Sequence, residues 1–508
     1  MGQYLLGIDN GNTISKVAIF DLNGKEQHVA SCSVETEYAK PGWTERSLAG
    51  FWQGVATAIR ETLAKAAINP AEIVGIGCSG HGNGLYLLDK AGQPLGNGIQ
   101  SLDTRASGIV DGWHEAGLHR QVFSQTLQAL WPAQPNALLA WLKTHEPARY
   151  ESIGAVLLCK DYVNYRLTDQ IRTDYSDISA TSLFDVPRKE YSKELLYSFG
   201  IPEIYEALPR LAHSFEVIGQ VTAAAAAATG LAVGTPVVGG MFDVDASAVG
   251  AGVYRPGQAC LIAGTWSINE VVTAEPVIDP NLFMTTIFSA PETWLTIEAS
   301  PTSATNLEWF VTQFCAEERL DAEKRGISVF EVCSEAVASI APDNANIIFH
   351  PFLYGSNVQA NARSGFYGVA GWHTRAHLLR ALFEGVVFSH LNHIEKLRAA
   401  GANFDIARLT GGGSRSKVWA QMFADILGTP IEIPDGTETG ARGAALSAGI
   451  GAGVYNSYDE AVDEAVSVVR THEPISANTP LYLARYEAYK HLVEAMQPSW
   501  DHLAGLQR

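Results

Sequence analysis

The chain opens with two apolar runs that flank a polar turn. Residues 4–9 (YLLGID) and 16–21 (KVAIFD) are strand-like apolar runs, and the turn LNGKE follows them, so we predict a hairpin over residues 4–30. Residues 44–66 then carry apolar side chains at helical spacing and predict an amphipathic helix. Residues 72–80 (EIVGIGCSG) predict a buried strand that ends in glycines.

The same order of elements returns further along. Residues 235–243 (TPVVGGMFD) predict a strand that ends at Asp243, and residues 258–274 predict a second hairpin around a Gly-Thr turn. Residues 407–428 predict a strand, a glycine turn and a helix, with the glycines opening the helix. The alanine run 223–228 predicts a short helix. Strands and helices alternate throughout, which indicates α/β layers in two related halves.

Length and composition bound the class of protein. A chain of 508 residues is too long for one hydrophobic core, and we predict two domains, residues 1–248 and 249–508. With 47% apolar and 18% charged residues the composition is that of a globular protein. The formal charge of −19 argues against a nucleic acid or an anionic membrane as partner.

The cysteines and the apolar runs indicate a compartment. Six cysteines are scattered without a C-x-x-C pair, which fits a reducing compartment. No apolar run approaches the length of about 18 residues that a membrane helix needs, and no secretion signal is recognisable. We therefore expect a soluble, cytoplasmic protein.

One glycine motif suggests a dinucleotide site. Gly75, Gly77 and Gly80 match G-x-G-x-x-G after a strand, but a dinucleotide fold requires a helix to open there. The next residues, HGNGLYLLDKAGQP, predict another strand and turn. We favour a plain strand-end turn, and a dinucleotide-dependent oxidoreductase stays a rival. The chain has no G-x-x-x-x-G-K-[ST] motif of a P-loop.

The turn of the first hairpin has the chemistry of a phosphate site. Gly11, Asn12 and Thr13 offer backbone N–H groups and a hydroxyl without bulky side chains, and Lys16 follows. Asp9 is a carboxylate suited to hold Mg²⁺ directly or through water. Taken alone, these residues are more simply explained as a plain β-turn.

Two later turns repeat this chemistry. Gly264, Thr265 and Trp266 form a second turn between apolar runs. Gly411, followed by Gly412, Gly413 and Ser414, forms a third beside a predicted helix, whose N-terminus favours anions or a nucleotide. Three such turns in one chain favour a site for a phosphorylated ligand.

These motifs together resemble a known family. D-x-G-x-[ST]-x-x-K at residues 9–16, GGMFDVDASAVGAG, the later GTW and the GGG near residue 412 are similar to the FGGY carbohydrate kinases. The resemblance covers essentially the whole chain, including PGWTERSLAGFW and CKDYVNYRLTD. On EASPTSATNLEWF and HTRAHLL, the chain is most similar to members that act on L-xylulose.

The resemblance implies a fold and an activity. The fold would be a two-lobed α/β actin-like ATPase (ribonuclease H-like) fold that closes over a central cleft. The activity would be ATP-dependent phosphorylation of a hydroxyl on a small sugar or polyol, with ATP and Mg²⁺ as cofactors. We expect a ketopentose such as L-xylulose, with D-xylulose, ribulose, erythritol and glycerol as alternatives, and a homodimer is one of the oligomeric alternatives. A non-catalytic actin-like sensor is a further rival, although Asp9 and Asp243 are both present.

The resemblance also assigns roles. Asp243 would be the general base that accepts the proton of the sugar hydroxyl, a role for which an ordinary carboxyl pKa is adequate, and would contact the metal together with Asp9. Asp245 is an alternative base, or a helix N-cap. The phosphate and adenosine contacts would come from the three turns: Gly11, Asn12, Thr13, Lys16, Gly264, Thr265, Trp266, Gly412, Gly413 and Ser414.

The expected sugar contacts lie in the first half of the chain. Besides Asp243 they are His81, Gly82, Asn83, Asp103, Arg105, Trp131 and Asp161. For Arg105 and Asp161 a structural ion pair or a cap is an equal alternative. Asn12 stands where the family commonly has Thr, and Asn83 where its pentulose kinases usually have His. The phosphate contact within the first turn and the identity of the sugar are therefore left open.

Overall fold

The computed structural model describes residues 2–33, 35–356, 358–359 and 361–506. The chain forms two compact units. The first contains Met1–Pro256, Val272–Thr296 and Gly436–Ser467, and the second contains Gly257–Val271, Ile297–Asp435 and Val468–Arg508. Each unit is thus built from segments that are distant in sequence, and the division into residues 1–248 and 249–508 stays a prediction.

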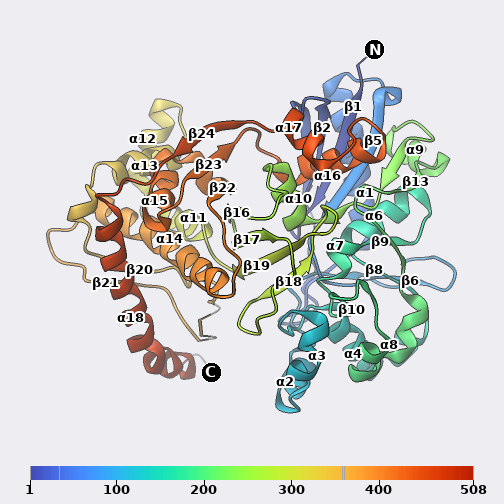
Figure 1. The fold of residues 1–508 in the computed structure, drawn as a ribbon, viewed down its shortest axis with the longest axis horizontal. Helices are drawn as coiled ribbons and strands as arrows, with labels where there is room; N and C mark the ends of the chain where they lie inside the picture. The colour runs from blue at the N-terminus through green and yellow to red at the C-terminus, as the bar shows by residue number, and fades with distance from the viewer. Residues whose placement is uncertain (1, 34, 357, 360, 507–508) are drawn as a thin grey trace. The chain divides into compact units, whose positions relative to one another are not determined.

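The sheet of the first unit begins with the predicted hairpin. β1 (Tyr4–Asn10) and β2 (Ile14–Asp21) are antiparallel, and β3 (Glu26–Ser33) continues the meander on the far side of β2. The buried strand β5 (Ile73–Gly80) lies parallel to β1 on its other side. These strands confirm the elements expected over residues 4–30 and 72–80 (Figure 1).

Residues 235–243 form two short strands instead of the single strand predicted. β14 (Pro236–Val238) and β15 (Met241–Phe242) are each parallel to β5, and β13 (Val217–Gln220) pairs with β14. Gly240 breaks the run because its φ of +77° is a conformation that L side chains rarely adopt, and a Cβ there would lie 2.2 Å from the carbonyl oxygen of Cys78. The break lets the chain turn before Asp243.

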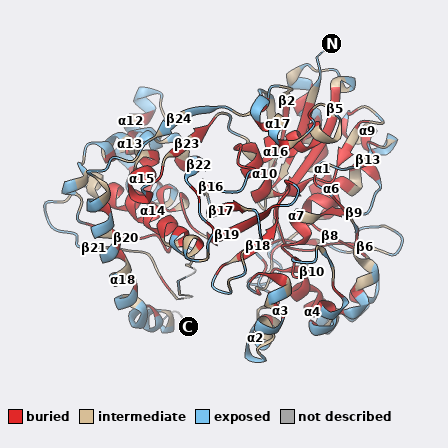
Figure 2. Cartoon of the chain, in the orientation of Figure 1, coloured by how far each residue is buried: buried red, intermediate tan, exposed pale blue. Residues whose placement is uncertain are grey.

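One face of this sheet is covered by the predicted helix. α1 (Leu48–Ala66) starts at Ser47, whose side chain accepts a hydrogen bond from the N–H of Gly50. Phe51, Val55 and other apolar side chains of its inner face pack with Ile8 and their neighbours in one buried core, which Figure 2 colours red. The helical spacing read from the sequence is the spacing of this buried face.

The other face is covered by α16 (Thr439–Gly451), a helix of small residues. A Cβ at Gly77 would lie 1.9 Å from the carbonyl oxygen of Ala444, and one at Gly75 would lie 2.8 Å from that of Ala448. The third glycine of the motif, Gly80, faces α6. These glycines are therefore needed for close packing of helix on strand, and β5 runs through the whole motif without a helix opening there. This geometry excludes the dinucleotide fold.

The remaining elements of the first unit surround this sheet, most of them in a lower layer of helices and short strand pairs (Figure 1). Its helices are α2 (Ser107–Glu115), α3 (Leu118–Thr126), α4 (Pro135–His145), α5 (Pro147–Glu151), α6 (Cys159–Thr168), α7 (Tyr175–Ile178), α8 (Lys193–Ser198), α9 (Ala223–Thr229), α10 (Asp243–Gly250) and α17 (Tyr458–Ala465). Its short strands are β4 (Glu45–Arg46), β6 (Tyr86–Asp89), β7 (Gly98–Ile99), β8 (Ile153–Leu157), β9 (Arg172–Asp174), β10 (Phe184–Asp185), β11 (Glu190–Tyr191), β12 (Arg210–Ala212) and β18 (Met284–Ile287). Helix α9 confirms the short helix expected in the alanine run.

The sheet of the second unit repeats the first arrangement. β16 (Gln258–Ala263) is antiparallel to β17 (Ser267–Thr273), which confirms the second hairpin, and parallel to β22 (Ile406–Thr410). β23 (Ile431–Pro434) and β24 (Val468–His472) extend the sheet beyond β22. A hairpin whose first strand also pairs in parallel with a later strand is therefore found in both units.

Helices pack around this second sheet. They are α11 (Thr305–Phe314), α12 (Ala316–Arg325), α13 (Val329–Ala338), α14 (Arg375–Ala399), α15 (Lys417–Leu427) and α18 (Thr479–Gly505). The strands β19 (Trp294–Ser300), β20 (Ile348–His350) and β21 (Gly365–Tyr367) complete the order. The predicted α/β layering is confirmed. Within the described residues, no helix combines the length and the apolar character that crossing a membrane requires.

Candidate active site

The carboxyl ends of three parallel strands meet in the first unit. Asp9 of β1 pairs in register with Ser79 of β5, and Ser79 pairs on its other side with Met241 of β15. Asp243 follows two residues after Met241. Because neighbouring strands lie about 4.8 Å apart, β1 and β15 are separated by about 10 Å across β5. The sheet therefore places Asp9 and Asp243 on either side of the end of β5.

Asp9 is held in place by its neighbours. The hydroxyl of Ser79 donates a hydrogen bond of 2.8 Å to Oδ1 of Asp9. Lys16 stands directly opposite Asp9 on β2, so the two side chains share one face of the sheet. Burial raises the pKa of Asp9, and the bond from Ser79 and the charge of Lys16 oppose that rise.

Asp243 is the first residue of α10, directly after β15. Burial, together with repulsion from Asp9, raises the pKa of Asp243 to about 8. Hydrogen bonds from its own N–H and that of Val244 oppose the rise. The sequence alone shows neither this burial nor the proximity of Asp9, so it gives no sign of the raised pKa.

Two such carboxylates suit a divalent cation. A cation beside Asp9 and Asp243 would offset their mutual repulsion. Mg²⁺ usually keeps several waters and takes only one or two protein carboxylates together with phosphate oxygens. Among the described residues no group of three or more His, Cys, Asp or Glu side chains could hold a metal. The site thus fits Mg²⁺ bound with its water and phosphate ligands, and does not fit a closed metal cage.

In the first turn some polar groups are hydrogen-bonded within the chain and others are exposed to solvent. The N–H of Gly11 donates to the carbonyl of Ile14 at 3.0 Å and closes the turn. The side chain of Asn12 exchanges hydrogen bonds with the hydroxyl of Ser101. Thr13 is exposed on the same turn, and its hydroxyl lies outside that network. Thr13 is therefore better placed than Asn12 to meet a phosphate.

Sequence reasoning missed the residues that approach this turn from α16. Glu438 precedes α16 and accepts a hydrogen bond of 2.7 Å from Nζ of Lys16. A Cβ at Gly440 would lie 2.5 Å from Oδ2 of Asp9, so the start of α16 abuts that carboxylate. The small-residue stretch TETGARGAAL after a strand was the available signal. Its contact with Asp9 depends on the way the chain folds back onto the first sheet, which no local sequence pattern shows.

The second unit brings its two predicted turns together. The N–H of Gly264 donates to the carbonyl of Trp266, and the carbonyls of Gly264 and Thr265 accept from the segment that leads into α11. A Cβ at Gly411 would lie 2.7 Å from the carbonyl oxygen of Ala263, at the end of β16. The Gly-Thr turn and the triple-glycine turn therefore follow the carboxyl ends of the neighbouring parallel strands β16 and β22.

The sequence analysis predicted that the glycines after β22 open the α-helix, and this prediction is wrong. Gly412–Arg415 form a 3₁₀ turn, and α15 starts after Ser416, whose hydroxyl accepts from the N–H of Trp419. The hydroxyl of Ser414 donates back to the carbonyl of Gly411 at 2.8 Å. The flat glycine surface at Gly412 thus precedes the helix, because Ser416 provides the cap that the glycines cannot.

Three of the predicted sugar contacts are engaged in buried ion pairs. Arg105 donates two hydrogen bonds of 2.9 Å to the carboxylate of Asp103 and a third to Glu45, and its guanidinium lies over the ring of Trp43. Asp161 accepts from the N–H of Leu158 and pairs with Lys160. The geometry favours the structural alternative for Arg105 and Asp161.

The loop after β5 holds the other candidates. His81 contacts the carbonyl of Gly82 through Nδ1 and the hydroxyl of Tyr86 through Nε2, and burial lowers the pKa of His81 to about 3. Among the described residues, Oδ1 of Asn83 and Nε1 of Trp131 are buried without a hydrogen-bond partner. The N–H of Gly84 donates to the carbonyl of Ala133, so this loop lies against the loop of Trp131. Asn83 and Trp131 therefore keep polar atoms that a sugar hydroxyl would satisfy.

Asp245 is not the helix N-cap that was one of its two expected roles, and its carboxylate is hydrogen-bonded. Phe242 is the N-cap of α10, so Asp245 lies inside the helix and not at its cap. Its Oδ1 accepts hydrogen bonds of 3.0 Å from the N–H and the hydroxyl of Ser289. A carboxylate tied in this way is a weaker candidate for a base than Asp243.

Comparison with known proteins covers nearly the whole chain. Residues 4–250 match the N-terminal domain of the FGGY family of carbohydrate kinases, and residues 259–452 match its C-terminal domain. The chain is 41% identical over 500 residues to the L-xylulose/3-keto-L-gulonate kinase of Escherichia coli K12, with 98% of each protein covered. It is 39% identical to a probable L-xylulose kinase of Pasteurella multocida, with 97% of this chain and 99% of that protein covered.

A solved structure agrees with these matches. The xylulose kinase of Rhodospirillum rubrum superposes with a TM-score of 0.86 at 27% identity, over 98% of this chain and 100% of that one. The predicted actin-like ATPase fold is confirmed by this likeness together with the two domain matches. The predicted cleft stays a prediction.

Proposed function

This chain belongs to the FGGY family of carbohydrate kinases and is an ATP-dependent sugar kinase, and we propose that its acceptor is a neutral ketopentose, L-xylulose first of all. The names of the relatives in Escherichia coli and Pasteurella multocida support this acceptor. The observation that carries the proposal is the pair of carboxylates, Asp9 and Asp243, at the ends of parallel strands beside a glycine turn. This pair offers one group for a metal and one for a proton.

Asp243 is the base of the proposed reaction. As the sugar oxygen attacks the γ-phosphorus of ATP, the bond from that phosphorus to the bridging oxygen of ADP breaks, and the proton of the sugar hydroxyl passes to the carboxylate of Asp243. The position of Asp243 at the N-terminus of α10, after β15, supports this role. The raised pKa of Asp243 makes it a good proton acceptor once it is ionised.

Asp9 is the proposed carboxylate for Mg²⁺. When bound, Mg²⁺ would neutralise charge on the phosphate oxygens. The hydrogen bond from Ser79 orients the carboxylate of Asp9 for this role, and Lys16 lies opposite Asp9 on β2. Thr13 is the proposed phosphate contact in the first turn, because its hydroxyl is exposed.

The turns of the second unit are proposed to bind the nucleotide. Gly264, Thr265 and Trp266 offer backbone N–H groups and a hydroxyl to phosphate oxygens. Gly412 and Gly413 present a surface without side chains, which suits the flat adenosine group, and Ser414 borders it. The placement of both turns at the carboxyl ends of neighbouring parallel strands supports this assignment.

The acceptor site is proposed to lie at the loop of Asn83 and Trp131. Their unpartnered polar atoms, one acceptor and one donor, match what a sugar hydroxyl both gives and takes. The charges around this loop are mixed, because carboxylates lie at the strand ends, Lys160 is paired with carboxylates, and the positive charge of Arg46 acts on His81. The choice of a neutral ketose over an anionic sugar acid such as 3-keto-L-gulonate therefore rests on L-xylulose, which the names of both relatives contain.

A coupled assay of ADP release tests both the reaction and the acceptor. L-xylulose, D-xylulose, ribulose, erythritol, glycerol and 3-keto-L-gulonate are supplied with ATP and Mg²⁺, and the largest kcat/KM is expected for L-xylulose. A larger value for the sugar acid would overturn the neutral acceptor.

The base is tested with a matched pair of variants. Asp243→Asn is expected to lower kcat by about 10²-fold or more, the usual contribution of a general base. Asp245→Asn removes a neighbouring carboxylate of the same helix and is expected to keep most of the activity. Near-normal turnover by Asp243→Asn would remove Asp243 from its role, and loss confined to Asp245→Asn would transfer the role there.

A further inference from the structure

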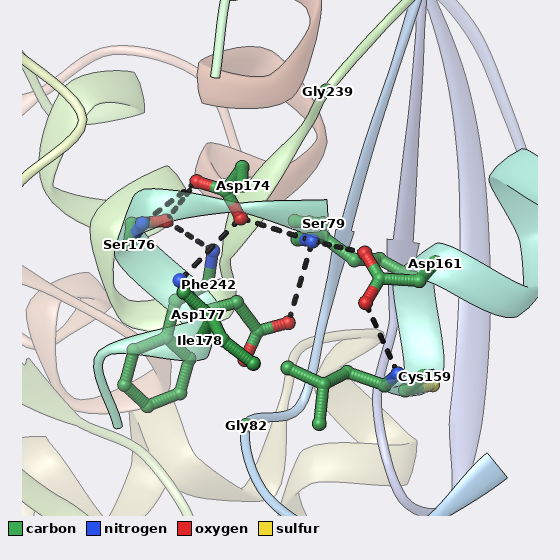
Figure 3. Close-up of polar contacts among 12 residues, drawn as sticks. Ser79, Gly82, Cys159, Asp161, Asp174, Ser176, Asp177, Ile178, Gly239 and Phe242 are labelled. Carbon is green, nitrogen blue, oxygen red and sulfur yellow. Dashed lines mark hydrogen bonds and ion pairs between the residues drawn. The ribbon is translucent and has the colours of Figure 1, made fainter. Parts of the chain in front are cut away.

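A fully buried lysine lies close to the proposed base without touching it. Nζ of Lys160, on α6, is 2.5 Å from Oδ1 of Asp161, 2.9 Å from Oδ1 of Asp174 and 3.6 Å from Oδ2 of Asp177. We call these four residues the Lys160 cluster. Figure 3 shows its three carboxylates converging on one point. Burying charges together costs desolvation energy that their attraction repays only in part, so a stabilising role alone does not explain the cluster.

The end of the sheet makes room for this lysine. A Cβ at Gly80, the last residue of β5, would lie 2.9 Å from the backbone nitrogen of Lys160 and 3.2 Å from its Cβ. A Cβ at Gly240, just before β15, would lie 3.4 Å from Cδ of Lys160. The lysine stem therefore runs past two glycines at the edge of the sheet where Asp243 begins α10.

A chain of hydrogen bonds connects the lysine to the backbone of this edge. Oδ1 of Asp174 forms an ion pair with Lys160. Oδ2 of Asp174 accepts a hydrogen bond of 2.6 Å from the hydroxyl of Ser176 and one of 2.8 Å from the hydroxyl of Ser214. The hydroxyl oxygen of Ser176 in turn accepts from the N–H of Phe242 at 3.0 Å (Figure 3). Because a serine hydroxyl has one proton, directing it to Asp174 turns a lone pair toward Phe242.

Phe242 is the residue before the base. It ends β15 opposite Gly80 and is the N-cap of α10, and its own side chain cannot cap that helix. The backbone that carries Asp243 is therefore fixed by the pairing of β15 with β5 and by the hydroxyl of Ser176.

We propose that Lys160 is a positioning residue for Asp243, acting through Asp174 and Ser176 on the N–H of Phe242. The lysine fixes Asp174, Asp174 orients the hydroxyl of Ser176, and that hydroxyl holds the backbone from which the base projects. This inference rests on the proposed function, since it gives the cluster a purpose only if Asp243 accepts the proton. A small displacement of a catalytic group lowers the rate of the chemical step much more than substrate affinity.

The chain offers a matched pair of serines for the test. Ser176→Ala and Ser214→Ala each remove one hydroxyl that donates to the same oxygen of Asp174, but only Ser176 also holds Phe242. Ser176→Ala is expected to lower kcat at least tenfold while KM for the sugar and for ATP stays within twofold. Ser214→Ala is expected to keep kcat within threefold of the wild type. Its change in melting temperature is expected to be similar to that of Ser176→Ala.

A double-mutant cycle tests the route through the acid. If Asp174 acts through Ser176, the double variant Asp174→Asn/Ser176→Ala should have a kcat close to that of the less active single variant. Independent effects would instead multiply the two losses in kcat. Lys160→Met should likewise lower kcat without a further loss when Ser176→Ala is added. If Lys160→Met does not fold, the comparison of the two serines decides the proposal.

The outcomes separate this proposal from the proposed function. A wild-type protein that phosphorylates no sugar would overturn the function itself. An active wild type with an inactive Asp243→Asn variant, and equal kcat values for Ser176→Ala and Ser214→Ala, would leave the function standing and overturn the positioning role. Multiplicative losses in the cycle would also overturn it.

Discussion

Replacing Asp243 by asparagine is expected to make the ligand-free protein more stable while it lowers kcat by about 10²-fold or more. The pKa of Asp243 lies at about 8 in the folded chain and at its usual value of 3.8 when the chain is unfolded. At pH 7 the folded chain therefore holds a proton that the unfolded chain releases. That release favours unfolding, and the isosteric, neutral asparagine removes it.

The magnitude follows from the gap between the pH and the unfolded pKa. Each pH unit between 3.8 and 7 is worth about 1.4 kcal/mol, so the upper value is about 4 kcal/mol. Asp243 keeps part of its surface exposed, and we therefore expect about half of this, about 2 kcal/mol. In a chain of 508 residues that corresponds to a rise of about 2 °C in melting temperature.

The sign of the pH dependence gives the sharper test. Below pH 3.8 both states of the wild type hold the proton, so wild type and variant should not differ through this group. Between pH 3.8 and about 8 the wild type loses stability relative to the variant, and above 8 the gap should be constant. Thermal unfolding in EDTA, without nucleotide, from pH 4.5 to 8.5 measures this gap.

The exposed Asp111 on α2 supplies the control. Asp111→Asn makes the same exchange at an exposed site, and it measures the effect of the exchange where no burial is involved. A gap for Asp243→Asn that is the same at pH 4.5 and pH 8, or a variant less stable than the wild type at pH 7, would refute the reasoning.

Three further predictions follow from the packing and the ion pairs. Gly77→Ala should destabilise the first unit by about 3 kcal/mol or more, because its Cβ would lie 1.9 Å from the carbonyl oxygen of Ala444, whereas Gly108→Ala on α2, with open space around its Cβ, should stabilise the chain by about 0.5 kcal/mol; denaturant unfolding compares them. Arg105→Lys should lower stability by about 2 kcal/mol through loss of the bidentate pair and leave KM for the sugar unchanged, and a raised KM at normal stability would return Arg105 to the sugar site. Asp9→Asn should raise the Mg²⁺ concentration for half-maximal turnover at least tenfold, read from a Mg²⁺ titration at saturating ATP, and an unchanged midpoint would contradict the metal role.

Local patterns predicted the elements that carry the site. The sequence pattern predicted the two hairpins, the helix over residues 44–66 and the strand over residues 72–80. Such predictions succeed because the period of apolar residues depends on which side chains face the core. Resemblance to the family then selected Asp9 and Asp243 among many carboxylates, and their roles stay predictions. The strand break at Gly240 escaped prediction, since it depends on the carbonyl of Cys78 in another strand.

By itself the sequence determined the α/β order, the glycine turns at strand ends and the residue types of a phosphoryl-transfer site. Only the tertiary structure decided what each polar group has as a neighbour. It paired Arg105 with Asp103, tied Asp245 to Ser289, and brought Glu438 to Lys16 across most of the chain length. The glycines of GIGCSG gained their meaning in the same way, as room for α16 and α6. The physical reason is that side-chain periodicity is local, whereas desolvation, ion pairing and close packing depend on residues that only folding makes neighbours.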